Sequence, residues 1–158
     1  MTSGSDPVGS LRIRLAVADD LQVLLDLTAE DAIRTFDEPT TPTDNQRAAL
    51  AEIIADPVHD LLVGEIDGRI VTTAHLSWLR VLMYDGGLMC QIESVRTATA
   101  LRGQGIGNQL MACIEAEARR RGAARLQLTT NKKRLRAHEF YQRLGFTPSH
   151  TGMKKILI

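Results

Sequence analysis

Apolar and polar positions along the chain predict a succession of strands and helices. They alternate over 11–17, as in a half-buried strand, and leucines at helical spacing follow a helix cap at Asp19 or Asp20. Asp67-Gly68 separates two apolar runs, which is typical of a β-hairpin. The hairpin strands are expected at 60–66 and 69–79, and the other elements are a loop at 36–44, helices at 43–55, 105–121 and 133–144, strands at 88–97 and 124–130, and short closing strands at 146–148 and 153–158. This order predicts the fold class α/β (α+β), with a mixed, mostly antiparallel central sheet flanked by about four helices in a single domain.

Length and composition limit the classes of function. The 158 residues suit one domain, which we place at 11–158 after a polar tail at 1–10 that is expected to be disordered and lacks the features of a signal peptide. Lys plus Arg and Asp plus Glu both total 19, which argues against a nucleic-acid-binding protein held by net positive charge. No apolar run is long enough for a membrane span, so we expect no membrane partner and a cytoplasmic location. Cys90 and Cys113 are expected to be buried free thiols, with Cys113 on the apolar face of the helix at 105–121.

The segment Arg-Gly-Gln-Gly-Ile-Gly-Asn at 102–108 carries the most specific local signal. Three glycines at alternate positions allow a tight backbone path and keep Cβ atoms away from a ligand. A predicted strand leads into the segment and a predicted helix leaves it, so unpaired N–H groups and the positive end of the helix dipole face the loop. The sequence therefore predicts a site for a phosphate-type anion, with a simple tight turn as the alternative.

This loop differs from two common nucleotide-binding loops. A Walker A loop requires Lys and then Ser or Thr after its last glycine, but Asn108 and Gln109 follow Gly107. A dinucleotide fingerprint spaces its glycines unevenly and has an acidic residue after the next strand, where this chain has Thr-Thr-Asn-Lys at 129–132. Basic residues in that region leave an NADP-binding loop open as an alternative.

A second motif, Phe-Tyr-Gln-Arg-Leu-Gly-Phe at 140–146, follows the glycine loop by about 35 residues. Together with the loop and the Ile-Glu pair in the strand before it, this motif resembles the GNAT superfamily of acyl-CoA-dependent N-acyltransferases. The resemblance extends over 11–146 in the order of elements and is sharpest over 91–146. It implies a GNAT-like fold and transfer of an acetyl group from acetyl-CoA, as co-substrate, to an amine.

The resemblance also implies how coenzyme A is held. Backbone N–H groups of the glycine loop would bind the pyrophosphate, and the pantetheine arm would lie along the strand at 88–97 like an added strand. Val95 and Thr97 would supply backbone contacts there, while Ser94 and Arg96 point to the other face. The implied loop ligands are Arg102, Gly103, Gln104, Gly105, Ile106, Gly107 and Asn108.

One position departs from the family pattern. Many relatives carry Asn seven residues before the tyrosine of the second motif, where this chain has Arg134. Asn131, three residues earlier, is a candidate substitute for that coenzyme contact. Arg134 and its basic neighbours could instead meet a coenzyme phosphate, with a solvated helix face as the alternative; the neighbours are Lys132, Lys133 and Arg136.

The implied reaction is direct attack of the amine on the thioester in a ternary complex, and it needs a base and an acid. Glu93, nine residues before Arg102, holds a position that is acidic in many relatives; its apolar neighbours predict partial burial, which would strengthen it as a base. A carboxylate that only orients the substrate is the alternative. Tyr141 is the candidate acid for the leaving thiolate, with a core tyrosine as the alternative, and the Val95 N–H is a candidate oxyanion donor.

The acceptor pocket is implied at the first two helices, their connecting loop and the segments beside the central strand. The residues concerned are Phe36, Asp37, Glu38, Trp78, Tyr84 and Asp85. Acidic groups near aromatic rings would suit a small cationic amine, although an ordinary polar loop is the alternative.

Three functions follow from these patterns. A small-molecule N-acetyltransferase is favoured because both Glu93 and Tyr141 are present. A protein or peptide N-acetyltransferase and a non-catalytic acyl-CoA-binding regulatory domain are the alternatives. The four histidines show no metal-ligand spacing, so no metal is expected. The resemblance is compatible with a homodimer.

Overall fold

The computed structural model describes residues 9–30, 33 and 39–158. These residues form two compact units, one ending at Gln127 and the other spanning Leu128–Ile158. Most of the tail expected at 1–10 lies outside the described residues, as does the part of the expected loop at 36–38.

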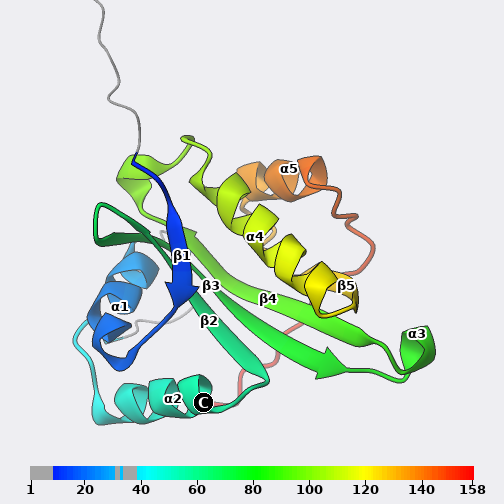
Figure 1. The fold of residues 1–158 in the computed structure, drawn as a ribbon, viewed down its shortest axis with the longest axis horizontal. Helices are drawn as coiled ribbons and strands as arrows, with labels where there is room; N and C mark the ends of the chain where they lie inside the picture. Colours follow the sequence, from blue (N-terminus) through cyan, green and yellow to red (C-terminus); the bar gives the residue numbers. More distant parts are fainter. Residues whose placement is uncertain (1–8, 31–32, 34–38) are drawn as a thin grey trace, which may run out of the picture. The chain divides into compact units, whose positions relative to one another are not determined.

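The first unit follows the predicted order of elements closely (Figure 1). Its helices and strands are β1 (Arg12–Leu15), the 3-10 turn η1 (Ala18–Asp20), α1 (Leu21–Ala29), α2 (Asp44–Ala55), β2 (His59–Ile66), β3 (Arg69–Arg80), the short α3 (Met83–Gly86), β4 (Leu88–Thr97), the 3-10 turn η2 (Thr99–Leu101), α4 (Ile106–Arg120) and β5 (Ala123–Leu128), whose last residue begins the second unit. No helix of the described residues is both long and apolar enough to cross a membrane.

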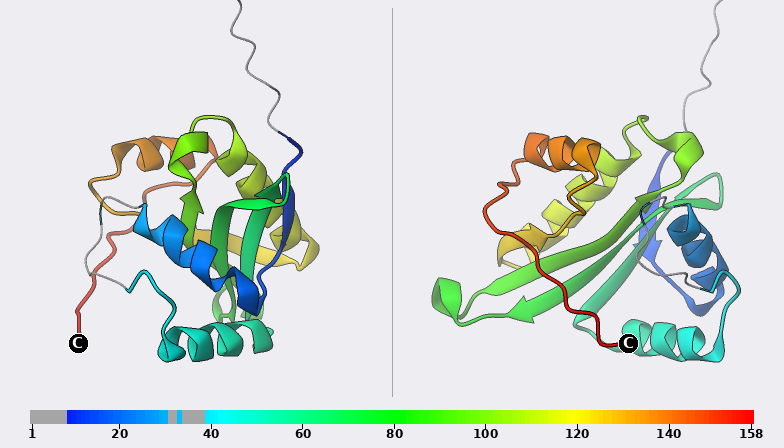
Figure 2. Two further views of the ribbon diagram at one scale, coloured as in Figure 1. Left: turned by 90° about the vertical axis from the view of Figure 1, so that its left-hand side faces the viewer. Right: turned by 180° about the vertical axis from the view of Figure 1, so that it is seen from behind.

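The five strands form one sheet in the order β1-β2-β3-β4-β5. The first three neighbouring pairs are antiparallel. Side chains of β4 and β5 meet at a constant offset of 36 residues, at Met89 with Arg125 and at Gln91 with Gln127, which is the register of parallel strands. Figures 1 and 2 show α1 and α2 on one side of the sheet and the crossover helix α4 on the other. A mixed, mostly antiparallel sheet with helices on both sides confirms the predicted fold class.

Local signals placed two boundaries correctly. Asp67 and Gly68 have φ angles of 50° and 75°, so the hairpin turn is confirmed. Thr43 caps α2, because its side chain accepts a hydrogen bond from the Gln46 N–H while the Gln46 side chain returns one to the Thr43 N–H.

The prediction that an aspartate side chain caps α1 is wrong. Asp20 precedes the helix but makes no side-chain hydrogen bond to it. Its carboxylate accepts hydrogen bonds from the Val17 N–H at 2.8 Å and from Arg14 Nη1 at 2.7 Å. Asp20 therefore ties β1 to the 3-10 turn instead of closing α1.

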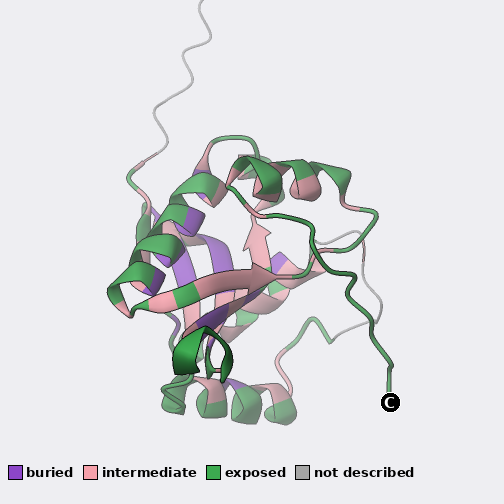
Figure 3. Cartoon of the chain, turned by 90° about the vertical axis from the view of Figure 1, so that its right-hand side faces the viewer, coloured by how far each residue is buried: buried purple, intermediate pink, exposed green. Residues whose placement is uncertain are grey.

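The buried face of α4 supplies much of the core. Five apolar side chains of this helix are buried, namely those of Ile106, Leu110, Met111, Ile114 and Ala118. They recur every three or four residues, so they form one stripe along the helix. In Figure 3 the buried residues gather on the strands of the sheet and on the inner face of the helices.

The two cysteines differ in their surroundings. Cys90 is fully buried in β4, and burial raises the pKa of its thiol to about 12, so it is an inert core residue. The prediction that Cys113 is buried is wrong, because this residue is exposed. It precedes the buried Ile114 by one position, which turns it about 100° around the helix and away from the core.

The second unit holds one helix, α5 (Leu135–Arg143), which ends at Gly145 with a φ of 92°. The closing strands expected at 146–148 and 153–158 are wrong, since no strand follows β5 in Leu128–Ile158. Met153, Leu157 and Ile158 are each more than four-fifths exposed. An apolar run becomes a strand only where its backbone groups pair with a neighbouring strand, and the run alone does not show whether one is present.

Candidate active site

The glycine loop lies between η2 and α4 and ends in a left-handed residue. Gly103 and Gly105 have φ angles of 78° and 81°, and Gly105 occupies the N-cap position of α4. No side chain caps this helix end. The first N–H groups of a helix have no partner within it, so this end offers donors and a positive dipole to an anion.

The glycines are not required by crowding within the chain. A Cβ atom built on Gly103 or Gly105 would meet no heavy atom within 4 Å. Their positive φ angles require glycine for a different reason, because a left-handed backbone strains residues that carry a Cβ. The open space beside both residues is available to a ligand.

Contacts from other parts of the first unit hold the start of the loop. The Glu30 carboxylate, just after α1, accepts hydrogen bonds from the Thr99 N–H at 2.6 Å and from the Thr99 hydroxyl at 2.8 Å. These bonds lower the pKa of Glu30. Ile106 is buried against Ile66 and Val71. The sequence offered no sign of the Glu30 contact, because 69 residues separate Glu30 from Thr99.

A β-bulge interrupts β4 near the middle of the expected site. Thr73 pairs with Arg96 and His75 pairs with Glu93, so two residues of β4 lie opposite the single residue Ala74. One of these two, Ser94, has a φ of 53°. Strict alternation would have placed Glu93 on the face of Val95 and Thr97. The bulge instead places Glu93 on the face of His75, Thr73 and Arg96.

The carbonyl groups expected to contact the pantetheine arm already have partners. Arg96 Nη1 donates to the Val95 carbonyl at 2.9 Å, and Arg102 Nε donates to the Thr97 carbonyl at 3.2 Å. The Thr97 hydroxyl lies 3.1 Å from the Thr72 hydroxyl. A carbonyl oxygen can accept two hydrogen bonds, so a coenzyme that used these carbonyls would share them with the two arginine side chains.

Glu93 faces an imidazole pair that the sequence did not indicate. Glu93 is exposed, so the partial burial expected for it is wrong. Opposite it, His75 Nε2 lies 3.1 Å from His59 Nδ1, and the ring centroids are 4.9 Å apart. The Ser77 hydroxyl lies 3.2 Å from the same His59 nitrogen. The predicted hairpin turn alone would pair His59 with Leu76, and the bulge between Gly64 and Glu65 shifts the register by one residue so that His59 pairs with Ser77.

The environment of His75 favours its neutral form. Burial lowers the pKa of His75, the neighbouring His59 lowers it further, and the negative charge of Glu93 acts in the opposite direction. A neutral imidazole can accept a proton, so this residue is able to act as a base near neutral pH.

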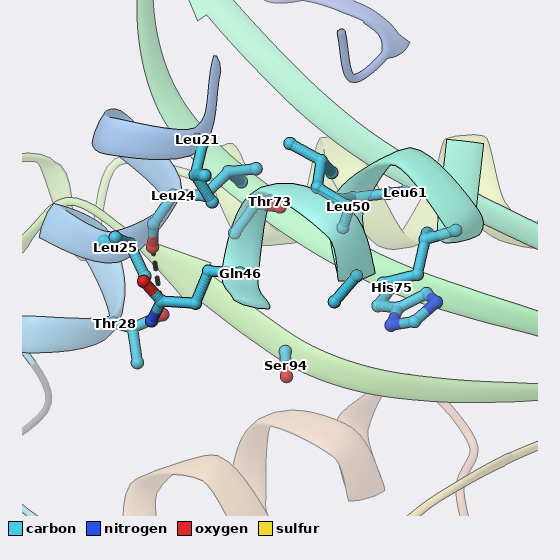
Figure 4. A pocket seen from close by; sticks show the side chains of 12 residues that line it. Leu21, Leu24, Leu25, Thr28, Gln46, Leu50, Leu61, Thr73, His75 and Ser94 are labelled. Carbon is cyan, nitrogen blue, oxygen red and sulfur yellow. Dashed lines mark hydrogen bonds between the residues drawn. The ribbon is translucent and has the colours of Figure 1, made fainter. Parts of the chain in front are cut away.

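A pocket of about 210 Å³ lies between α1, α2 and the sheet (Figure 4). The lining residues are Leu21, Leu24, Leu25 and Thr28 of α1, Gln46, Ala49, Leu50 and Ile53 of α2, and Leu61, Thr73, His75 and Ser94 of the strands. In Figure 4 the His75 ring lies at the end remote from Leu24 and Leu25. Apart from His75, no ionisable side chain of the described residues lines this pocket.

The acceptor residues expected on β3 and the β3–β4 turn do not line this pocket. Trp78 is only 6% exposed, and its Nε1 donates to Asp60 Oδ2 at 2.8 Å, so its role is structural. Tyr84 and Asp85 are exposed in α3, each with a φ of 56°. The other three expected residues, at 36–38, lie outside the described part of the chain.

In the second unit, Tyr141 is half-buried on α5. Its ring makes edge contacts with those of Phe140 and Phe146, at centroid distances of 5.1 and 5.7 Å. This packing holds the ring in place. The role of Tyr141 as an acid stays a prediction.

Asn131 has a clear local role in that unit. Its Oδ1 accepts a hydrogen bond from the Lys133 N–H at 2.9 Å, and its carbonyl accepts one from the Arg134 N–H at 2.9 Å. The residue therefore forms the turn that leads into α5, where Arg134 occupies the N-cap position. The basic neighbours Lys132, Lys133 and Arg136 are exposed.

Comparison with known proteins assigns the family. The model of the acetyltransferase (GNAT) family matches residues 22–146. The aminoalkylphosphonate N-acetyltransferase of Salmonella typhimurium is 36% identical over 115 residues, which are 70% of this chain and 71% of that protein. The aminoglycoside N(6')-acetyltransferase type 1 of Serratia marcescens is 29% identical over 122 residues, 73% of this chain and 81% of that protein.

A solved structure agrees with this match. The crystal structure of a Bacillus halodurans protein described as a transcriptional regulator superposes with a TM-score of 0.88 at 34% identity, covering 94% of this chain and 100% of that one. The family match includes parts of both compact units, as expected for one domain. The chain belongs to the GNAT family and is an acetyl-transferring enzyme.

Proposed function

We propose that this protein transfers an acetyl group from acetyl-CoA to the primary amine of a small molecule, by direct attack in a ternary complex. The observation that carries the proposal is the uncapped amino end of α4 behind Gly103 and Gly105, which suits a pyrophosphate. The Salmonella and Serratia relatives, whose names describe small-molecule N-acetyltransferases, support the acceptor class.

The residues proposed to bind the coenzyme are those of the loop, with the N–H groups of β4 along the pantetheine arm. Arg102 to Asn108 would hold the pyrophosphate. Val95 and Thr97 would meet the arm, and Asn131 and Arg134 would contact the coenzyme from the start of α5. Both remain candidates for a phosphate contact, because the hydrogen bond from the Lys133 N–H uses only the side-chain oxygen of Asn131 and leaves its amide donors.

The chemistry requires a neutral amine, a stabilised oxyanion and a protonated leaving group. The Val95 N–H would donate to the oxyanion, and Tyr141 would give its proton to the coenzyme thiolate. Glu93 is exposed beside the pocket residue His75, so we propose that it attracts and orients the substrate ammonium.

The pocket supports an amine with an apolar body. Leucine and isoleucine side chains of α1, α2 and β2 make up most of its lining, and His75 is the one ionisable side chain among the described lining residues. An aminoalkylphosphonate carries a phosphonate that would need a cationic partner, and an aminoglycoside carries several ammonium groups that would need anionic ones. Neither kind of partner lines the pocket in the described part of the chain.

A thiol-release assay with acetyl-CoA tests the proposal. The amine panel is 2-phenylethylamine, hexylamine, 2-aminoethylphosphonate, kanamycin and a peptide with a free amino terminus. We expect release with the first two and intersecting initial-velocity lines, as in a ternary complex. Release with the peptide alone would favour the protein N-acetyltransferase. Coenzyme binding by calorimetry without release from any amine would favour the non-catalytic domain.

A further inference from the structure

The two imidazoles on β2 and β3 form a hydrogen-bonded pair with one end at the pocket. His75 lines the pocket, and its Nε2 lies 3.1 Å from His59 Nδ1. The other ring nitrogen of His75, Nδ1, has no hydrogen-bond partner among the described residues. Both rings are half-buried. Such an arrangement leaves one nitrogen for a substrate and connects the other to a second imidazole.

Few charged groups lie near this imidazole pair among the described residues. From β4, Glu93 faces His75 and Arg96 lies on the same face, and from β2, His59 faces it. The pocket residues that α1 and α2 direct toward it are uncharged. His75 is therefore the one ionisable side chain among the described residues that line the pocket.

We propose that His75 and His59 form a proton relay that removes the proton from the acceptor ammonium. This inference rests on the proposed acetyl transfer and deepens it by assigning the base. It gives Glu93 the separate task of orienting the ammonium.

The relay moves one proton from the ammonium through the two imidazoles to water. The ammonium N–H bond breaks, its proton goes to Nδ1 of neutral His75, and the freed nitrogen lone pair attacks the thioester carbonyl carbon. The proton on His75 Nε2 passes to His59 Nδ1 along the 3.1 Å contact. His59 then donates to the Ser77 oxygen, 3.2 Å away, and releases a proton from its outer nitrogen to water.

The environment agrees with this direction of transfer. Burial and the neighbouring His59 both lower the pKa of His75, so it is neutral and ready to accept at neutral pH. A carboxylate opposite it partly offsets this effect and would stabilise the imidazolium once it forms.

The test is a pH profile of kcat/KM for 2-phenylethylamine and hexylamine at saturating acetyl-CoA. The variants are His75→Gln and His59→Gln, with the exposed His150→Gln as the matched control. We expect His75→Gln to lower kcat about a hundredfold at pH 7 and to remove the bend at acidic pH, because general base catalysis contributes on the order of 10²–10⁴. His59→Gln should lower kcat less and move the bend to higher pH, since the charge that lowers the pKa of His75 is gone. His150→Gln should have the same kcat and the same pH profile of kcat/KM as the wild type.

Two measurements keep the result interpretable. Thermal unfolding shows whether each variant is folded, and calorimetry with coenzyme A shows whether the coenzyme site survives. A folded His75→Gln variant that keeps both the turnover and the acidic bend would overturn the relay while leaving acetyl transfer intact. Loss of turnover with an unchanged bend would also overturn it. A wild type that acetylates no amine of the panel would overturn the proposed function and the relay together.

Discussion

The Arg121 guanidinium lies over the Trp78 ring, 4.2 Å from its centroid. The same arginine contacts Asp60 Oδ2 and Glu117 Oε1, each at 2.7 Å, while Trp78 donates to that Asp60 oxygen. These four side chains join the end of α4 to β2 and β3. The aromatic ring that the sequence offered as part of an acceptor pocket therefore holds a helix against a sheet.

This network makes Arg121 a stability residue. We expect Arg121→Ala to lower the free energy of unfolding by about 2–3 kcal/mol, because Asp60 and Glu117 each lose a charge-assisted hydrogen bond and Trp78 loses a cation above its ring. Urea unfolding measures the change. Arg119→Ala is the matched control, since Arg119 pairs with Glu115 on the exposed surface of the same helix, where such a pair contributes only about 0.3–0.5 kcal/mol. Equal losses in the two variants would contradict a structural role for the Trp78 network.

The glycine loop allows a sharper test of anion binding. Gly105 and Gly122 flank the two ends of α4, both have positive φ, and a Cβ on either would meet open space. Gly105→Val and Gly122→Val should therefore lose similar stability, at least about 1–2 kcal/mol each from the left-handed backbone. Only Gly105→Val should lose affinity for coenzyme A, because only its side chain would enter the proposed phosphate site.

Calorimetric titration with coenzyme A, beside thermal unfolding of both variants, separates strain from binding. If Gly105→Val binds as tightly as Gly122→Val, the amino end of α4 is not the phosphate site.

Local signals in the sequence determine the parts of this fold that could be predicted. The strand at 88–97, the hairpin turn at Asp67 and the helix at 43–55 were predictable from local patterns, and the structure adds a capping box at Thr43. The bulge at Ser94 could not be predicted, because a non-glycine residue with positive φ is held there by its pairing with β3. The contacts between His59 and His75 and between Glu30 and Thr99 join distant segments and leave no local pattern.

The sequence could indicate a candidate site that one segment carries, and it could not indicate a pocket that several segments form. The glycine loop is continuous in sequence, so its residues were identifiable together. The pocket is lined by residues of α1, α2 and three strands, and its leucines cannot be distinguished in sequence from those of a core. The family resemblance instead indicated Tyr84 and Asp85, which are exposed in α3.

Glu93→Gln distinguishes the two roles of that carboxylate. Glu93 raises the pKa of His75, so its removal should move the acidic bend of kcat/KM to lower pH while kcat changes little. The KM for the amine should rise, because the ammonium loses its negative partner. The measurement is the pH profile with 2-phenylethylamine, with the exposed Glu139→Gln as control. A fall in kcat of about a hundredfold with loss of the bend would instead make Glu93 the base.

Tyr141→Phe tests the acid. The phenyl ring retains the edge contacts with Phe140 and Phe146, so the fold of α5 should be unchanged. We expect turnover to fall at least about tenfold with little change in the KM for acetyl-CoA, because the proposed proton donor for the thiolate is lost while the ring remains. Thiol release measures both quantities, and Tyr84→Phe serves as control, since Tyr84 is exposed and its hydroxyl only accepts a hydrogen bond from Arg125 at the protein surface. Unchanged turnover would leave Tyr141 with a packing role only.

Asp20 should make the stability of the first unit depend on pH. Hydrogen bonds from Arg14 lower the pKa of this carboxyl below its ordinary value of 3.8, and the Val17 N–H adds to the effect. A carboxyl with a lowered pKa stabilises the fold above its unfolded value and loses that contribution as the pH falls through its folded value. We expect Asp20→Asn to cost about 2 kcal/mol at pH 7, because Arg14 loses one of its two carboxylate partners and keeps Glu65, and the difference from the wild type to shrink below pH 3.8. Urea unfolding of both proteins between pH 7 and pH 3 measures this difference, and a constant gap across the range would show that the ionised carboxylate is not its source.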